Sequence, residues 1–223
     1  MDTFVRWAGG CWIAAGVLLL AELAHPDALG IGFAASSLET LWPAVHVAWT
    51  LVVILTLFGL AGLMARFGTV LGRLGVIGAV VAVPGLVVSG GLFLAEAFVF
   101  PILAREDPGL LDLDGAFLGS ALLRLAAGCA GLWFLGLVLV GWAVEGARVL
   151  PRGTGLALAV AAVLFAALEG PFLPVAGELA VVGLAAAHVW LGAALLRDGR
   201  RGLPTVAFGE GSGRTATPEG TAR

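Results

Sequence analysis

The chain has few charged residues and no lysine at all. Only 12% of its 223 residues are charged, whereas a soluble domain carries about 25%. Hydrophobic residues make up 60% of the sequence, and the mean hydropathy is +1.05. This composition excludes a water-soluble globular protein. The net charge of −3, with the acidic excess in loops, also excludes a basic surface for nucleic acid.

Cysteine and the common catalytic motifs are scarce as well. Cys11 and Cys129 fall in different apolar stretches and form no CxxC or other ligand-like spacing. We expect no structural disulfide, because buried membrane thiols usually serve as small packing residues. The sequence has no P-loop, no strand-linked GxGxxG, no GxSxG and no paired Asp-rich motif. These absences argue against an enzyme.

What the sequence does contain is a series of long apolar stretches. Six of them come close to or exceed the length that crosses a hydrocarbon core of about 30 Å. They cover residues 7–24, 41–64, 75–103, 117–143, 154–170 and 178–196. All are continuously apolar, whereas the strands of membrane barrels alternate apolar and polar residues. The sequence predicts an all-α, polytopic membrane helix bundle with six transmembrane helices within residues 1–198.

The placement of arginine orients this bundle. With six spans, eight arginines fall on one side of the membrane, and splitting the stretch at 75–103 would spoil this bias. They are Arg6, Arg66, Arg73, Arg148, Arg152, Arg197, Arg200 and Arg201. Because positive residues favour the cytoplasmic side, both termini are predicted to lie inside, in a bacterial inner membrane.

The last part of the chain differs from the rest in composition. Residues 199–223 are rich in Gly, Ser, Thr and Pro and lack apolar residues to pack. They predict a disordered cytoplasmic tail. The lipid bilayer is the partner that the composition implies, and a second copy of the chain or a membrane partner subunit remains open.

Small residues within the spans predict where helices approach closely. Glycine at an interface lets two helix backbones come near each other in a membrane. Six such positions are Gly59, Gly62, Gly75, Gly78, Gly128 and Gly131.

Ionisable residues inside the spans are the candidates for function. Such a group costs about 2.5–3.5 kcal/mol at the bilayer centre, so it needs a partner or a wet cavity. Glu96 stands out because Pro84-Gly85 and Gly90-Gly91 interrupt its helix, and interrupted helices beside an acid mark binding sites in transporters. Arg124 lies at a similar depth on the next helix, which predicts an ion pair with Glu96.

His46 completes the predicted site, about one turn inside the outer end of its helix. Together with Glu96 and Arg124 it predicts a ligand or proton pocket that opens outward. Secondary candidates are His25, Asp27, Glu22 and His188. His25-Pro26-Asp27 is also explained as a simple helix stop. For Glu22, Glu169 and Glu178, at helix ends, we favour capping or interfacial roles.

The sequence requires no cofactor. No ligand spacing such as HExxH is present, so the kind of metal, if any, is unknown. Haem held by His46 and His188 would need the two rings near one depth. Counting about 1.5 Å per residue from the helix ends places His188 several ångströms deeper, which argues against haem.

The run HPD…LWPAVHVAW…GLAGLMARFG…LAEAFVFPILA resembles bacterial six-span integral membrane proteins that form families of unknown function. The resemblance covers the first three predicted helices, about half of the chain. It implies the six-span fold and gives priority to His25, His46 and Glu96, but it carries no activity. The sequence therefore predicts a membrane protein that binds or moves a small ligand or proton. The alternatives are an accessory subunit whose polar residues only hold helices together, or a membrane enzyme or haem carrier.

Overall fold

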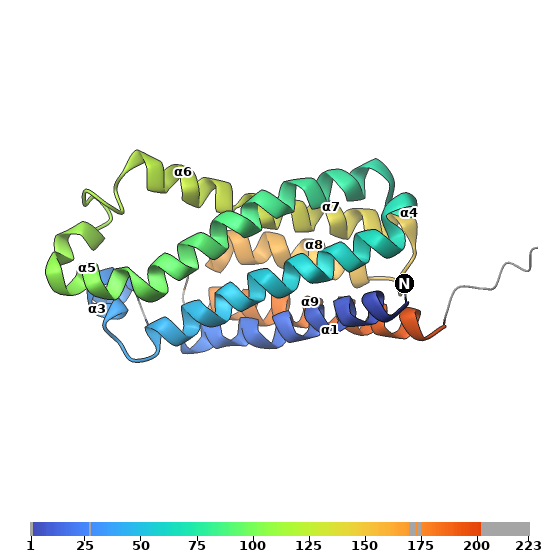
Figure 1. Ribbon diagram of the computed structural model, residues 1–223, viewed down its shortest axis with the longest axis horizontal. Helices are drawn as coiled ribbons and strands as arrows, with labels where there is room; N and C mark the ends of the chain where they lie inside the picture. Colours follow the sequence, from blue (N-terminus) through green and yellow to red (C-terminus); the bar gives the residue numbers. More distant parts are fainter. Residues whose placement is uncertain (1, 27, 170–172, 174, 202–223) are drawn as a thin grey trace, which may run out of the picture.

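The computed structural model describes residues 2–26, 28–169, 173 and 175–201, and helices make up most of this part of the chain (Figure 1). The elements are α1 (Asp2–Leu19), the 3-10 helix η1 (Leu20–Ala24), α2 (Ala28–Ile31), α3 (Phe33–Ser37), α4 (Trp42–Phe98), α5 (Phe100–Glu106), the 3-10 helix η2 (Pro108–Leu111), α6 (Ala121–Ala130), α7 (Leu132–Ala147), α8 (Thr154–Leu164), the π-helical turn η3 (Phe165–Glu169) and α9 (Ala176–Arg201). No strand occurs among the described residues. The predicted all-α fold is confirmed.

Helix α4 consists of two arms that meet at a single residue. Gly72 has φ 61° and ψ −158°, a backbone conformation that is essentially restricted to glycine. The chain reverses there, and the two arms, residues 42–71 and 73–98, run back along each other (Figure 1, light blue to green). Helical structure continues beyond the predicted spans 41–64 and 75–103 up to this glycine.

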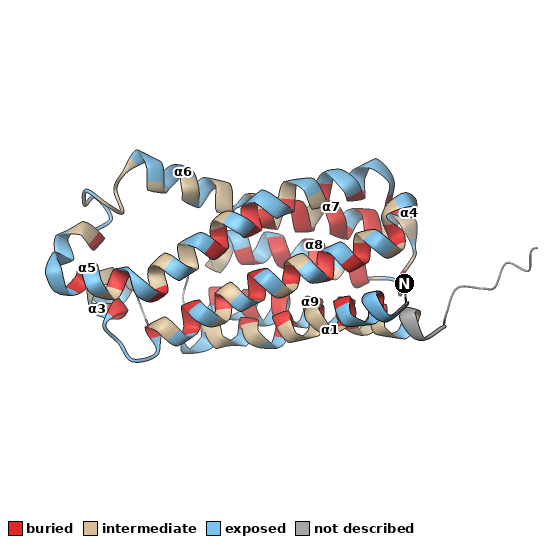
Figure 2. Cartoon of the chain, viewed as in Figure 1, coloured by how far each residue is buried: buried red, intermediate tan, exposed pale blue. Residues whose placement is uncertain are grey.

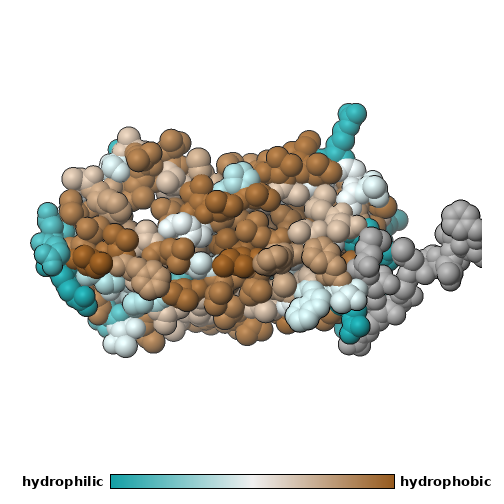
Figure 3. Space-filling model, viewed as in Figure 1, coloured by the Kyte–Doolittle hydropathy of each residue, from teal (hydrophilic) through white to brown (hydrophobic). Residues whose placement is uncertain are grey.

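Four helical stretches are long and apolar enough to cross a membrane. They are Thr3–Ala24, Trp42–Phe98, Ala121–Ala147 and Ala176–Asp198. Thr154–Glu169 is a shorter apolar helix. Figure 2 shows that buried residues gather on the inward faces of these helices, and Figure 3 shows apolar atoms over the flank between two more hydrophilic ends. An apolar surface of this extent is typical of a protein that lies in lipid.

Glycine brings helix backbones into direct contact, most tightly between α4 and α7. A Cβ atom added to Gly85 would lie 2.1 Å from the backbone nitrogen of Trp133, and one on Gly78 would lie 2.8 Å from that of Val140. Neither position tolerates a side chain without moving a helix.

The predicted glycine contacts are confirmed at four of six positions. Gly59, Gly62, Gly75 and Gly78 all have neighbours that an added Cβ would strike. The prediction is wrong for Gly128, which has no other atom within 4 Å of its ideal Cβ, and for Gly131, where the near atom is the carbonyl oxygen of Gly128. The cause is that α6 stands apart from its neighbours and contains no buried residue.

Two ends of the bundle differ in what they contain. The start of α1, the turn at Gly72 and the ends of α7 and α9 lie at one end, whereas α3 and α5 lie at the other (Figure 1). At the first end Arg66 Nε lies 2.8 Å from Asp198 Oδ2. Glu145 accepts hydrogen bonds from the backbone of Gly153 at 3.0 and 3.1 Å, joining the end of α7 to the start of α8.

Two boundaries in the structure differ from the predicted ones. The span predicted at 117–143 begins too early, because α6 starts at Ala121 after Ser120, whose hydroxyl accepts a hydrogen bond from the nitrogen of Leu123 at 3.2 Å. The predicted tail also begins too early, because α9 continues to Arg201. The rest of that predicted tail, residues 202–223, lies outside the described residues.

Candidate functional site

A cavity of about 360 Å³ lies among the ends of the helices that are far from Gly72. Residues from η1, both arms of α4, the junction of α6 and α7, and η3 form its wall. The lining residues are Glu22, His25, Phe33, Trp42, His46, Trp49, Ser89, Phe93, Glu96, Ala127, Ala130, Gly131, Trp133, Phe134, Phe165, Ala166 and Glu169. The fold thus brings most of the ionisable side chains of the spans to one place.

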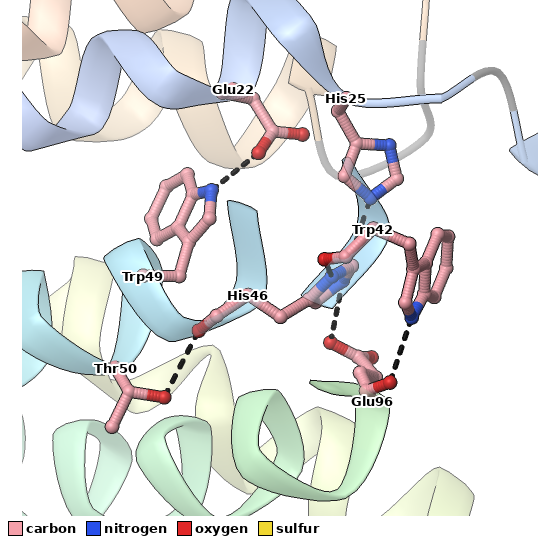
Figure 4. A network of polar contacts seen from close by, with 7 residues as sticks. All are labelled: Glu22, His25, Trp42, His46, Trp49, Thr50 and Glu96. Carbon is pink, nitrogen blue, oxygen red and sulfur yellow. Dashed lines mark hydrogen bonds and ion pairs between the residues drawn. The ribbon is translucent and has the colours of Figure 1, made fainter. Parts of the chain in front are cut away.

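His46 lies at the centre of a polar network in this wall and is almost fully buried (Figure 4). Its Nδ1 is 2.7 Å from the carbonyl oxygen of Trp42. A carbonyl can only accept, so Nδ1 carries a hydrogen and donates it. The Nε2 atom of His46 lies 3.2 Å from Glu96 Oε2 and 3.4 Å from His25 Nε2.

The contact between His46 and Glu96 holds one proton. Because Nδ1 already donates to a carbonyl, Nε2 of a neutral ring is an acceptor, and an ionised carboxylate is an acceptor too. Two acceptors do not bond, so a proton must sit either on Nε2 or on the Glu96 carboxyl group. The pair therefore shares one proton at the cavity wall, and the contact depends on that proton.

Trp42 fixes the position of this pair. Its Nε1 donates to the backbone carbonyl of Glu96 at 2.7 Å, and its ring contacts that of His46 with centroids 4.3 Å apart and a tilt of 36° between the ring planes. The indole therefore joins the two arms of α4 at the ends opposite Gly72. The hydroxyl of Thr50 donates to the carbonyl of His46 at 3.0 Å, on the next turn of the same arm.

A second pair of acids lines another side of the cavity. Trp49 Nε1 donates to Glu22 Oε2, and Glu169 lines the same cavity. Glu169 ends a π-helical turn, a distortion that is frequent at functional sites. Gly177 gives it room, since a Cβ there would lie 2.2 Å from Glu169 Oε2.

Glu22 and Glu169, for which we expected capping or interfacial roles, both line the cavity. Sequence position alone places each at a helix end, but it does not show that the ends of α1 and α8 meet. Glu178, by contrast, is exposed at the start of α9 and does not line the cavity.

His25 lies next to the network, just after the end of η1. Burial and, to a smaller extent, the neighbouring His46 together lower the pKa of His25 to about 4. Its ring is therefore neutral at pH 7. The ring centroids of His25 and Trp42 are 5.0 Å apart.

The structure brings His46, Glu96, His25 and Glu22 together, but not Arg124. Arg124 is exposed on α6. Within the described part of the chain the ion pairs are His46–Glu96 and Arg66–Asp198, so the predicted pairing of Arg124 with Glu96 is wrong. Depth along a helix does not fix the direction that a side chain takes around it.

His188 lies elsewhere in the bundle. It is fully buried in α9 against Trp12, with ring centroids 4.9 Å apart, and its Nδ1 donates to the carbonyl of Leu184 at 2.9 Å. Asp27, the remaining secondary candidate, lies outside the described residues. Among the residues that are described, no group of three or more His, Cys, Asp or Glu has the geometry to hold a metal ion.

Sequence reasoning missed the aromatic wall of the cavity. Trp49 lies at its centre, with its ring centroid 5.2 Å from Phe93, 5.6 Å from Phe165 and 6.1 Å from Trp133. The one available signal was the helical spacing, because Trp49 follows His46 by three residues and shares its face. The other rings come from distant parts of the chain.

Family models, curated proteins and solved structures give no match to this chain. The resemblance to six-span families stays a prediction.

Proposed function

We propose that this chain is a six-span membrane protein with both termini in the cytoplasm of a bacterium. Each arm of α4 is longer than the about 20 residues that a spanning helix needs. The two arms count as separate spans, which makes five spans from the four long helices. The apolar helix Thr154–Glu169, which packs between α7 and α9, is the sixth.

The arginines support this orientation. Arg66 and Arg73 flank the turn at Gly72, and Arg148 and Arg152 lie between α7 and α8, at the same end of the bundle as the start of α1. A positive end is the cytoplasmic one. The cavity lies toward the opposite end, so it faces outward.

The protein binds a small ligand in this cavity, and ligand binding is coupled to the binding or release of a proton. The observation that carries the proposal is the His46–Glu96 pair, which shares one proton at the wall of a cavity of about 360 Å³. Cavities for small molecules begin at about 300 Å³ and combine apolar walls with a few convergent polar groups. A subunit that only used polar residues to hold helices together would need no such space beside them.

A thermal-stability panel tests the proposal. Purified protein in detergent is heated with small organic cations, anions and neutral compounds of matched size, at several pH values. We expect at least one class to raise the melting temperature in a pH-dependent way, and Glu96→Gln to abolish that rise because the amide cannot exchange the shared proton.

Glu106→Gln is the matched control, because Glu106 is an exposed acid at the end of α5. It should keep the response of the natural chain. If no class shifts the melting temperature, or if Glu96→Gln responds as Glu106→Gln does, the proposed function is wrong.

A further inference from the structure

We propose that the ligand of this cavity is a small organic cation, such as a protonated amine or a quaternary ammonium group. The inference rests on the proposed function and adds the chemical class of the ligand. Three features of the cavity carry it: its charge, its aromatic wall and its size.

Most of the ionisable side chains in the wall are acidic. Glu22, Glu96 and Glu169 supply three carboxyl groups, and no arginine is found among the described lining residues. A carboxylate buried in a membrane protein needs a proton or a cation to offset its charge. The nearest arginine in sequence to the wall of α6, Arg124, is exposed outside the cavity.

One of the three carboxyl groups has a partner that offsets its charge. His46 and Glu96 share one proton, so that pair as a whole is neutral whichever atom holds it. Trp49 Nε1 donates to Glu22, but an indole N–H carries no net charge to offset a carboxylate. A cation in the cavity would supply the positive charge that the described lining residues lack.

The aromatic wall selects an organic cation. Trp49, Phe93, Trp133 and Phe165 surround one region of the cavity, and the faces of such rings attract ammonium groups within about 6 Å. A bare divalent ion would instead need several oxygen ligands at once. No group of three or more candidate ligands is arranged for a metal in the described residues.

The size of the cavity is the third feature. A volume of about 360 Å³ limits the occupant to the lower end of the range for small molecules.

Three probes that share one ring test the charge. Benzylamine is a cation at pH 7, benzyl alcohol is neutral and benzoate is an anion, and tetramethylammonium serves as a cation without a ring. Binding to the purified full chain in detergent is measured by tryptophan fluorescence and calorimetry. We expect benzylamine and tetramethylammonium to bind, and benzyl alcohol and benzoate to bind at least about thirtyfold more weakly.

Variants of the acid pair test the source of the charge. In the double variant Glu22→Gln with Glu169→Gln the wall loses two carboxyl groups while the His46–Glu96 pair stays, and affinity for benzylamine should fall about thirtyfold or more. Glu178→Gln, an exposed acid close to the pair, is the control and should bind like the natural chain.

The outcomes separate this inference from the proposed function. If benzoate or benzyl alcohol binds as tightly as the cations, the ligand is not a cation, although the cavity still binds a small molecule. The comparison of probes on the natural chain stands even if the double variant fails to fold. Equal affinity for benzylamine in a folded double variant would also overturn the inference. If no probe and no other compound class binds, both proposals fail.

Discussion

Replacing Gly85 by alanine should weaken the contact between α4 and α7. The added Cβ would lie 2.1 Å from the backbone nitrogen of Trp133 and 2.7 Å from the carbonyl carbon of Leu132. Real Cβ atoms essentially never come within 3.0 Å of another heavy atom, so the two helices must separate by roughly 1 Å. A gap of that size forfeits a quarter to a half of the dispersion energy of each contact across it.

The obstructing atoms are backbone, so no side-chain rotation can relieve the clash. The fully buried residues Ala82, Leu86 and Leu137 lie along the same interface and would lose contact as well. Overpacking of this kind costs about 1–3 kcal/mol, and the rigid obstruction favours the upper end. Against this, alanine gains about 1 kcal/mol over glycine in helix propensity.

Gly91→Ala is the matched control in the same arm of α4. An added Cβ at Gly91 meets no other atom within 4 Å, so this variant gains propensity without a clash. Unfolding in mixed detergent, followed by far-ultraviolet circular dichroism, should show Gly85→Ala unfolding about 3 kcal/mol more easily than Gly91→Ala. If the two variants unfold at the same detergent fraction, the helices are not in backbone contact at Gly85 and the reasoning is refuted.

Three further predictions concern single interactions. Trp42→Phe keeps an aromatic ring but removes the indole N–H that donates to the Glu96 carbonyl, and it should lower the free energy of unfolding by about 1 kcal/mol. No change in that free energy would mean that this bond does not join the two arms. The pKa of His25 is about 4 in the folded chain and 6.5 ordinarily, so its contribution to stability is complete above pH 6.5 and is lost as the pH falls toward 4. His25→Asn should therefore lose less melting temperature than the natural chain between pH 7 and 4, and parallel curves would contradict this. A double-mutant cycle on Arg66 and Asp198, half-buried and 2.8 Å apart, should give a coupling energy of up to about 1 kcal/mol, whereas strict additivity would argue against the ion pair.

The sequence predicts well those features that depend on composition along a single helix. The apolar stretches and the all-α fold follow from the cost of placing polar groups in lipid, and the same cost singled out His46 and Glu96, which line one cavity. The break in α4 is less predictable. Gly68, Gly72 and Gly75 all lie near it, and only the backbone angles at Gly72 show which of them makes the turn.

Features that depend on rotation about a helix, or on contact between distant helices, are not predictable in this way. Arg124 and Glu96 lie at similar depth, yet the Arg124 side chain is exposed. Glu22 and Glu169 are far apart in the sequence, and nothing in either segment indicates that they meet. A single sequence gives the depth of each residue in the membrane, whereas its partner is decided by how the helices pack.

The bond from Trp42 to the Glu96 carbonyl has a consequence for the shape of the cavity. The two arms of α4 are joined covalently through Gly72 at one end and by this indole at the other. On another side of the cavity, α6 buries no residue. The cavity therefore has one side whose two helices are tied together at both ends, and another side whose helix contributes no buried side chain to the core.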